Sequence, residues 1–363
     1  MAELIVRGSE YQSFLNCRKQ WYYQWVEGIE AKKPDGKLFF GTLFHKWLEF
    51  YYQNGCNKLQ ADLETSVWFN EQNTKDMDQV SIDETVALMK GVAEHYHNTY
   101  GETDKSFKIL ATELEFIVKL DEDLYMTGTI DLVYEVDGKI RFMDHKTVSS
   151  ISMYEEKAVM DRQISRYWWA LKMIAAGIGR INEPFIENGE KKDNWVKWNQ
   201  LADRTIDGFD YNLIAKDFPK PPKVLKPKKN QIIPELSQDK SQKTTYDLYL
   251  NKIHDLGHNE ADYADFLSFL ADKPNQFNKR VDVKRSDAEL ESAAWEFSYT
   301  AGDIHDVKLM IQNNPQSIEP LTYRNITNNC MHMCQFKSLC MTAIDGGNVN
   351  MVKNLGYKKR EEN

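Results

Sequence analysis

The chain is 363 residues long, which exceeds the usual size of one domain and predicts either two domains or one core with large insertions. Its hydrophobic content of 42% and aromatic content of 12% exclude an intrinsically disordered chain. A formal net charge of −9 argues against a protein that coats nucleic acid through bulk electrostatics, so a nucleic-acid site would have to be a local patch.

The sequence also limits location and redox chemistry. Its first residues hold no basic segment followed by an apolar run, and no stretch approaches the roughly 18 apolar residues of a membrane span. We therefore expect a cytoplasmic protein with no membrane partner. Five cysteines, an odd number in a chain without a secretory signal, argue against a disulfide framework and leave metal binding or free thiols.

The N-terminal part, residues 1–105, has the pattern of helices. Residues 9–27 place aromatic side chains at helical spacing after Ser9, which suits an N-cap. A second helix is predicted over 41–55. Gly41, His45 and Glu49 follow one another at four-residue spacing, and Gly55 supplies a stop signal. Spaced apolar positions over 60–100 predict further helices.

The pattern then changes to β-strands. Aromatic and β-branched runs cover 109–120, 126–136 and 139–148, and Asp137-Gly138 between the last two is a two-residue hairpin signal. Helical composition returns over 158–176. A sheet and its helix are therefore expected within 106–180.

The remaining chain is predicted to hold an insertion (181–275), a C-terminal helical part with a cysteine cluster (276–340) and a tail (341–363), so that 1–340 forms one domain. The insertion is expected to be mobile because it is rich in Lys, Asp, Asn and Pro. A run of charge is usually solvated, although these lysines could contact phosphates: Lys216, Lys220, Lys223, Lys226, Lys228 and Lys229.

The predicted hairpin brings charged side chains together. If Asp137-Gly138 is the turn, Val136 pairs with Lys139 and the ladder brings Asp131 opposite Asp144. Opposed carboxylates repel, so a cation should lie between them. Alternation puts Lys146 on the face of Asp144 and His145 on the other.

This face suits hydrolysis assisted by Mg²⁺ or Mn²⁺, because carboxylates hold such ions and the ion activates water. Lys146 would position that water or deprotonate it, and general-base and electrostatic roles both stay open. The alternative is a solvated strand with scattered charges.

Four short motifs occur in order along the chain: GxxxH ending at His45, GxxD from Gly128 to Asp131, DxK from Asp144 to Lys146, and QxxxY from Gln163 to Tyr167. In these motifs the chain resembles the RecB-like branch of the PD-(D/E)xK nuclease superfamily, including the CRISPR-associated RecB-like exonucleases and the nuclease domains of AddB and RecB. The resemblance implies a restriction-endonuclease-like α/β core, with a mixed central sheet of about four or five strands flanked by helices and with helical insertions.

The resemblance also implies roles for single residues. Lys146 would be catalytic, Gln163 and Tyr167 would face the site, and the alternative for these last two is a surface glutamine and a core tyrosine. Glu113 or Glu115 would be the glutamate of the preceding strand. The implied metal ligands are His45, Asp131, Asp144, the backbone carbonyl of His145, and Glu113.

The cysteines provide a second resemblance, because members of this branch hold a [4Fe–4S] cluster with one N-terminal and three C-terminal cysteines. The matching residues are Cys17, Cys330, Cys334 and Cys340. Three residues separate Cys330 from Cys334 where the family has two, so structural Zn²⁺ with His332 or Cys17 completing the ligands stays open. Cys56 is interpreted as a buried or free thiol.

The implied function is a Mg²⁺- or Mn²⁺-dependent deoxyribonuclease, an exonuclease or end-processing enzyme in recombination, repair or phage or plasmid DNA metabolism. Its substrate would be single-stranded DNA or DNA with free ends. The chain has no GxxxxGK[ST] phosphate loop, so a helicase or recombination partner would be separate. The alternatives are an inactive DNA-binding or scaffolding protein with a nuclease fold, and a metal–cysteine protein whose hairpin charges are incidental.

Overall fold

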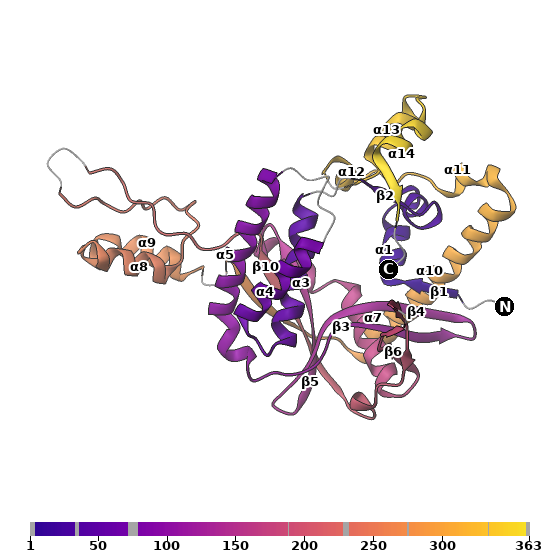
Figure 1. Cartoon of the computed structure of the whole chain (residues 1–363), viewed down its shortest axis with the longest axis horizontal. Coiled ribbons are helices and arrows are strands. Elements are labelled where there is room, and N and C mark those ends of the chain that lie inside the picture. Colours follow the sequence, from indigo (N-terminus) through magenta and orange to yellow (C-terminus); the bar gives the residue numbers. More distant parts are fainter. Residues whose placement is uncertain are drawn as a thin grey trace.

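Helices cover both faces of a mixed eight-stranded central sheet in the computed structural model (Figure 1), which describes residues 4–32, 36–71, 79–187, 189–227, 232–273, 276–332 and 334–360. This architecture confirms the predicted α/β class. The strand order is β11-β10-β5-β4-β3-β6-β9, and β1 pairs with β4 beside this path. The strands are β1 (Leu4–Arg7), β3 (Lys108–Asp121), β4 (Leu124–Val136), β5 (Lys139–Val148), β6 (Gly179–Asn182), β9 (Trp195–Val196), β10 (Ile206–Ala215) and β11 (Asn278–Val283).

The sheet is mixed because β10 runs parallel to β5 and β1 parallel to β4, whereas β3, β4 and β5 are successive antiparallel neighbours. Two small two-stranded sheets lie outside it, β2 (Ile29–Ala31) with β12 (Tyr357–Lys359) and β7 (Phe185–Glu187) with β8 (Glu190–Lys192). The helices are α1 (Gly8–Asn16), α2 (Arg18–Trp21), the π-helical turn η1 (Tyr22–Val26), α3 (Gly36–Gln53), α4 (Lys58–Glu71), α5 (Gln79–Asp104), α6 (Ile151–Ala158), α7 (Arg162–Ala175), α8 (Tyr246–Asp255), α9 (Ala264–Ala271), α10 (Asp287–Asn313), α11 (Ile318–Leu321), α12 (Asn328–His332), α13 (Lys337–Ile344) and α14 (Val349–Gly356).

Alternating side chains on β4 and β5 divide the core into two halves. Val133 and Phe142 face a core that includes residues of α1, α7 and α10. Leu132 and Met143 face the opposite core, which α3 and α5 complete. Because a strand alternates its side chains between faces, each half of the core is built from every second residue.

The expected strand count is wrong, since the sheet has eight strands rather than four or five. Strands β9 and β10 lie within 181–275, and β11 lies within 276–340. Strand β10 is an apolar run whose side chains are mostly buried, but polar sequence on both sides of it obscured its pattern. Residues 232–273, with α8 and α9, extend away from the sheet around a small core of their own (Figure 1).

The C-terminal residues are not a simple tail as expected. Strand β12 pairs with β2, so residues 357–359 lie beside residues 29–31. Figure 1 shows β2 next to the C-terminal helices α13 and α14. Tyr23 and Ile29 pack there with Phe336, Leu339 and Tyr357. The division into domains remains a prediction.

The predicted helix over 9–27 is interrupted. Cys17 has extended backbone angles, φ −162° and ψ 113°, and separates α1 from α2. Arg7, rather than Ser9, occupies the N-cap position, and no side chain caps that end. Within the described ranges, no helix has both the length and the apolar character needed to cross a membrane.

Candidate functional site

The β4–β5 hairpin has the predicted register. Asp137 and Gly138 both have positive φ, 51° and 73°, as a two-residue type I′ turn requires. Val136 pairs with Lys139, and the recorded ladder ends at Leu132 with Met143. One further step along this register places Asp131 opposite Asp144, as the sequence predicted.

The site lies along the edge of β4 with which both β1 and β5 pair. Strand β1 pairs with the first part of β4, up to Thr127, and β5 pairs with its last part, from Leu132. Asp131 lies in the interval between them, and its Oδ2 accepts a hydrogen bond of 2.6 Å from the backbone N–H of His145. A side chain of β4 thus binds the backbone of β5 just beyond the end of the regular ladder.

Three potential metal ligands converge at this point from three elements. The ligand atoms of His45 on α3, Glu113 on β3 and Asp131 on β4 all lie within 4.8 Å of one another. His45 Nδ1 is 3.8 Å from Asp131 Oδ2. Glu113 has φ 46°, a left-handed conformation that is uncommon outside glycine, and its neighbours Thr112 and Leu114 pair with the residues on either side of Asp131.

Asp144 lies beside this triad rather than in it. Its Oδ2 forms an ion pair of 2.6 Å with Lys146 Nζ. Gln163 on α7 contacts both partners at 3.5 Å, donating to Asp144 Oδ1 and accepting from Lys146. The structure therefore brings together the sequence-predicted residues in two adjoining groups, with Glu113 in the first and Asp144 in the second.

Two motif glycines allow close packing around the site. A Cβ at Gly128 would lie 3.0 Å from the rings of both Phe116 and Tyr167, which is too close for a side chain. Tyr167 is buried and packs edge-on against Phe116 at a centroid distance of 5.6 Å. On α3, a Cβ at Gly41 would lie 3.3 Å from Thr147 Oγ1 on β5, so the glycine of GxxxH lets the helix that carries His45 approach the sheet.

The electrostatics of the site favour a bound cation. Burial and then the charge of Asp131 raise the pKa of Glu113. Burial and the charge of Asp131 also raise the pKa of Asp144, although the positive charge of Lys146 opposes this shift. Burial alone would lower the pKa of Lys146, but Asp144 and Asp131 hold it above its ordinary value. Lys146 is thus a cation here, while the carboxylates remain crowded with like charge.

His145 points to the opposite face and belongs to a buried polar network. Its Nδ1 lies 2.8 Å from Asn212 Nδ2, and its ring stacks on Tyr52 at 5.8 Å. Burial lowers its pKa to about 3, so the ring is neutral. Asn212 also donates to Tyr96, which continues the network into α5. Sequence reasoning missed these partners, because α5 and β10 lie far along the chain from His145.

A groove of about 1510 Å³ opens beside the site. Its lining includes Glu113, Gln163 and Tyr167, together with Arg166, which the sequence did not single out. Residues of α1, α2 and η1 also line it. The groove is therefore shared by residues of the candidate site and by the N-terminal helices.

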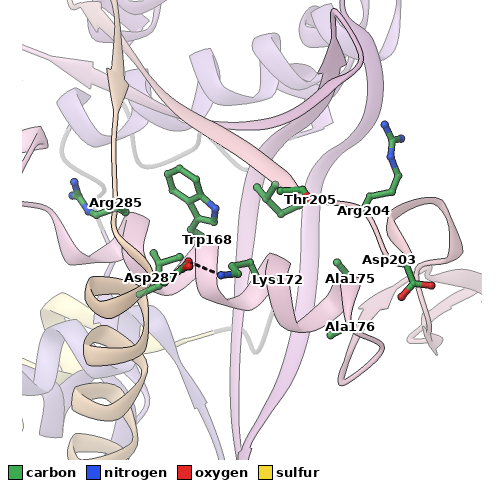
Figure 2. A pocket seen from close by; sticks show the side chains of 11 residues that line it. Trp168, Lys172, Ala175, Ala176, Asp203, Arg204, Thr205, Arg285 and Asp287 are labelled. Carbon is green, nitrogen blue, oxygen red and sulfur yellow. Dashed lines mark hydrogen bonds and ion pairs between the residues drawn. The ribbon is translucent and has the colours of Figure 1, made fainter.

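A smaller pocket of about 420 Å³ lies elsewhere on α7, and Figure 2 shows it lined by Trp168, Lys172 and Arg285. Lys172 is paired with Asp287 at 2.7 Å, drawn as a dashed line in Figure 2. Arg285 donates to Ser165 and to the backbone of Asp161, which ties the segment between β11 and α10 to α7. None of the motif residues lines this pocket.

The four predicted cluster cysteines lie in one region, all free and half-buried. Asn325 connects two of them, donating its N–H to Cys17 Sγ at 3.5 Å and accepting from Cys330 Sγ at 3.8 Å. Burial raises the pKa of Cys334, and the nearby thiols of Cys340, Cys330 and Cys17 raise it further.

In the described part of the chain, the four sulfurs do not form a group whose atoms all lie within 4.8 Å of one another. The side chain of His332 lies outside what the structure describes, as do Lys228 and Lys229. Cys56 is buried in the core beneath α3, away from the other four.

Comparison with known proteins gives one family. The sequence model of the PD-(D/E)XK nuclease superfamily matches residues 8–210, a range that begins at α1, contains all four motifs and ends within β10. No curated protein matches the chain.

Proposed function

Because the chain belongs to the PD-(D/E)XK nuclease superfamily, we propose that it is a Mg²⁺- or Mn²⁺-dependent deoxyribonuclease that hydrolyses phosphodiester bonds at the end of the β4–β5 hairpin. The observation that carries the proposal is the convergence of His45, Glu113 and Asp131 next to the Asp144–Lys146 ion pair. Membership of the superfamily supports a metal-dependent nuclease that acts on DNA, and the donor set supports the choice of metal.

The donor set suits a hard divalent cation. Two carboxylates and one imidazole offer oxygen and nitrogen ligands, and burial and mutual repulsion raise the pKa of Glu113, an effect that a cation would reverse. His45, Glu113 and Asp131 would hold the ion, with Asp144 and the backbone carbonyl of His145 as further ligands. When bound, the ion would activate water and neutralise charge on the phosphate.

The chain's own groups would orient the reaction. Lys146, paired with Asp144 at 2.6 Å, would position the attacking water or stabilise charge that develops on the phosphate. Gln163 would position Lys146 and Asp144, because it contacts both. Tyr167 would hold α7 against β4 through its packing at Gly128.

We further propose that the enzyme is an exonuclease or an end-processing nuclease of the RecB-like branch. The ordered motifs around His45, Asp131, Lys146 and Tyr167 support the branch. The sequence has no phosphate loop of its own, which supports a separate helicase or recombination partner in DNA recombination, repair or phage or plasmid metabolism.

The cysteines form the second part of the proposal. Cys17, Cys330, Cys334 and Cys340 would hold a [4Fe–4S] cluster, or structural Zn²⁺ in the alternative, because thiols from α12, α13 and the α1–α2 junction gather in one region. Such a group would tie the two ends of the chain together. Elemental analysis of anaerobically purified protein distinguishes iron from zinc, and Cys334→Ser should lower the content of the bound element; full retention would overturn the assignment.

The function is tested by digesting end-labelled single- and double-stranded DNA with Mg²⁺, Mn²⁺ or EDTA. Wild-type protein should cleave only with metal, and Asp144→Ala and Lys146→Ala should abolish cleavage. Asp255→Ala is a matched control, because Asp255 forms an exposed ion pair with Lys252 on α8. DNA binding without cleavage under any metal would instead establish the inactive scaffolding protein, and the product ladder separates exonuclease from endonuclease action.

A further inference from the structure

One wall of the large groove carries a row of neutral amide side chains. Every fourth residue along the first helices is a carboxamide, and all four line the groove: Gln12, Asn16, Gln20 and Gln24. The row continues across the break at Cys17, from α1 through α2 to the π-helical turn η1. Gln12 donates to Asn16 at 3.0 Å, whereas the amides of Gln20 and Gln24 have no partner within the described ranges.

Arg166 is the second unusual feature of the groove. Only 4% of the residue is exposed, and its Nε is buried without a hydrogen-bond partner. In the part of the chain that the structure describes, no carboxylate lies within ion-pair distance of its guanidinium, which stacks on Tyr11 at 4.6 Å. A buried charge without a partner is costly, so this position suits an anion supplied from outside.

The groove does not attract polyanions by net charge. Its lining holds four cations, Arg7, Lys46, Arg166 and Lys191, against five carboxylates, Glu49, Glu113, Glu115, Glu183 and Asp193. Affinity for a nucleic acid must therefore come from hydrogen bonds and from the few cations that are placed to meet a phosphate. Carboxamides are suited to this role, since each both donates and accepts.

We propose that the carboxamide row and Arg166 form a binding track for one strand of DNA, which leads to the metal site. Arg166 binds a phosphate close to the metal ligands, and Gln12, Asn16, Gln20 and Gln24 bind successive nucleotides away from it. Trp195, which lines the groove, offers a stacking surface for a base, and unpaired bases are available for stacking only in a single strand. The inference rests on the proposed nuclease function and specifies the form of its substrate.

The track is tested by equilibrium binding of a fluorescent oligothymidylate, in Ca²⁺ or EDTA so that no cleavage occurs, over a series of salt concentrations. Arg166→Met should raise the Kd about tenfold and reduce the slope of log Kd against log salt by about 0.7. Gln20→Ala with Gln24→Ala should raise the Kd by about threefold to tenfold and leave the slope unchanged, because no charge is lost. Gln312→Ala, an exposed amide on α10 outside the groove, is the matched control.

The melting temperature of each variant shows whether weakened binding results from a loss of folding. Because Arg166 has no compensating partner, Arg166→Met should leave the melting temperature unchanged or raise it while binding weakens. Unchanged oligothymidylate binding by both groove variants would overturn the track, and equal loss of duplex and single-strand binding would overturn its preference for one strand.

Failure of the track and failure of the nuclease are distinguishable, because wild-type cleavage with Mn²⁺ is measured in parallel. Cleavage by wild-type protein with normal binding by the variants rejects the track alone. Weakened binding by the variants, with no cleavage by any protein, supports the track and rejects the nuclease.

Discussion

Two largely buried arginines lie on opposite faces of the sheet and differ in their surroundings. Arg280 on β11 forms a bidentate pair with Asp104 on α5, with both distances 2.6 Å. Its Nη2 also donates to the hydroxyls of Tyr52 and Tyr96, while its Nε is buried without a hydrogen-bond partner. Arg166 on α7 is also buried, but its guanidinium lies over the rings of Tyr11 and Phe297, and the residue lines the groove.

The difference shows in the pKa of each guanidinium. Burial alone would lower the pKa of Arg280, but Tyr96, Tyr52 and Asp104 hold it well above its ordinary value. Burial lowers the pKa of Arg166, and its neighbours do not compensate. A compensated charge contributes to a closed structural network, whereas an uncompensated charge is available to a ligand.

The largest expected effect concerns catalysis on the open face. Asp131→Asn should reduce metal-dependent cleavage by at least about 10³-fold, because it removes a proposed metal ligand, and such a ligand contributes several kcal/mol in the transition state. The free energy of unfolding should not fall by a comparable amount, because the substitution relieves crowding with Glu113. Cleavage assays and denaturant unfolding of the same preparations measure both; retained cleavage would remove Asp131 from the site.

Breaking the hydrogen-bond network around Arg280 should instead reduce stability more than cleavage. Asp104→Asn leaves Arg280 buried without its carboxylate and should lower the free energy of unfolding by about 3–5 kcal/mol. Adding Arg280→Leu should recover part of that loss, because the uncompensated charge is then gone. If Arg166→Met destabilised the protein as much as Asp104→Asn, the contrast between the two arginines would not hold.

Asn212 connects the two faces, and its substitution sharpens the comparison. Asn212→Leu removes the partner of His145, whose backbone N–H binds Asp131. We expect metal affinity to fall about tenfold, as is typical for a residue that supports a metal site without binding the ion. Calorimetric titration with Mn²⁺ measures it, and an unchanged metal affinity in Asn212→Leu would contradict this supporting role.

The smallest expected effect is on stability against pH. The pKa values of Glu113 and Asp144 are raised in the folded protein, so the unfolded chain releases these protons at lower pH. Metal-free protein should therefore lose stability as pH rises from the ordinary carboxyl range through the raised values, and Mn²⁺ should reverse the loss at the upper end. Melting curves in EDTA and in Mn²⁺ test this, and Glu113→Gln should flatten the metal-free dependence; rising stability in that window would contradict the assigned direction.

The sequence by itself determined the local features of the site. The Asp137-Gly138 turn and strand alternation predict the opposition of Asp131 and Asp144 and the shared face of Asp144 and Lys146, because pairing between consecutive strands depends on nearby residues. Helical spacing placed His45 on α3 in the same way. The class of the sheet followed from the same patterns and from the resemblance.

Tertiary structure alone decided which groups meet. Polar sequence around β10 concealed a strand of the central sheet, and the left-handed conformation of Glu113 brought it to His45 and Asp131 in place of Asp144. Whether a buried arginine finds a carboxylate depends on residues such as Asp104 and Arg280, which are 176 positions apart. The periodicity of the sequence predicts which side chains are buried. The partner of each buried side chain depends on how distant elements pack.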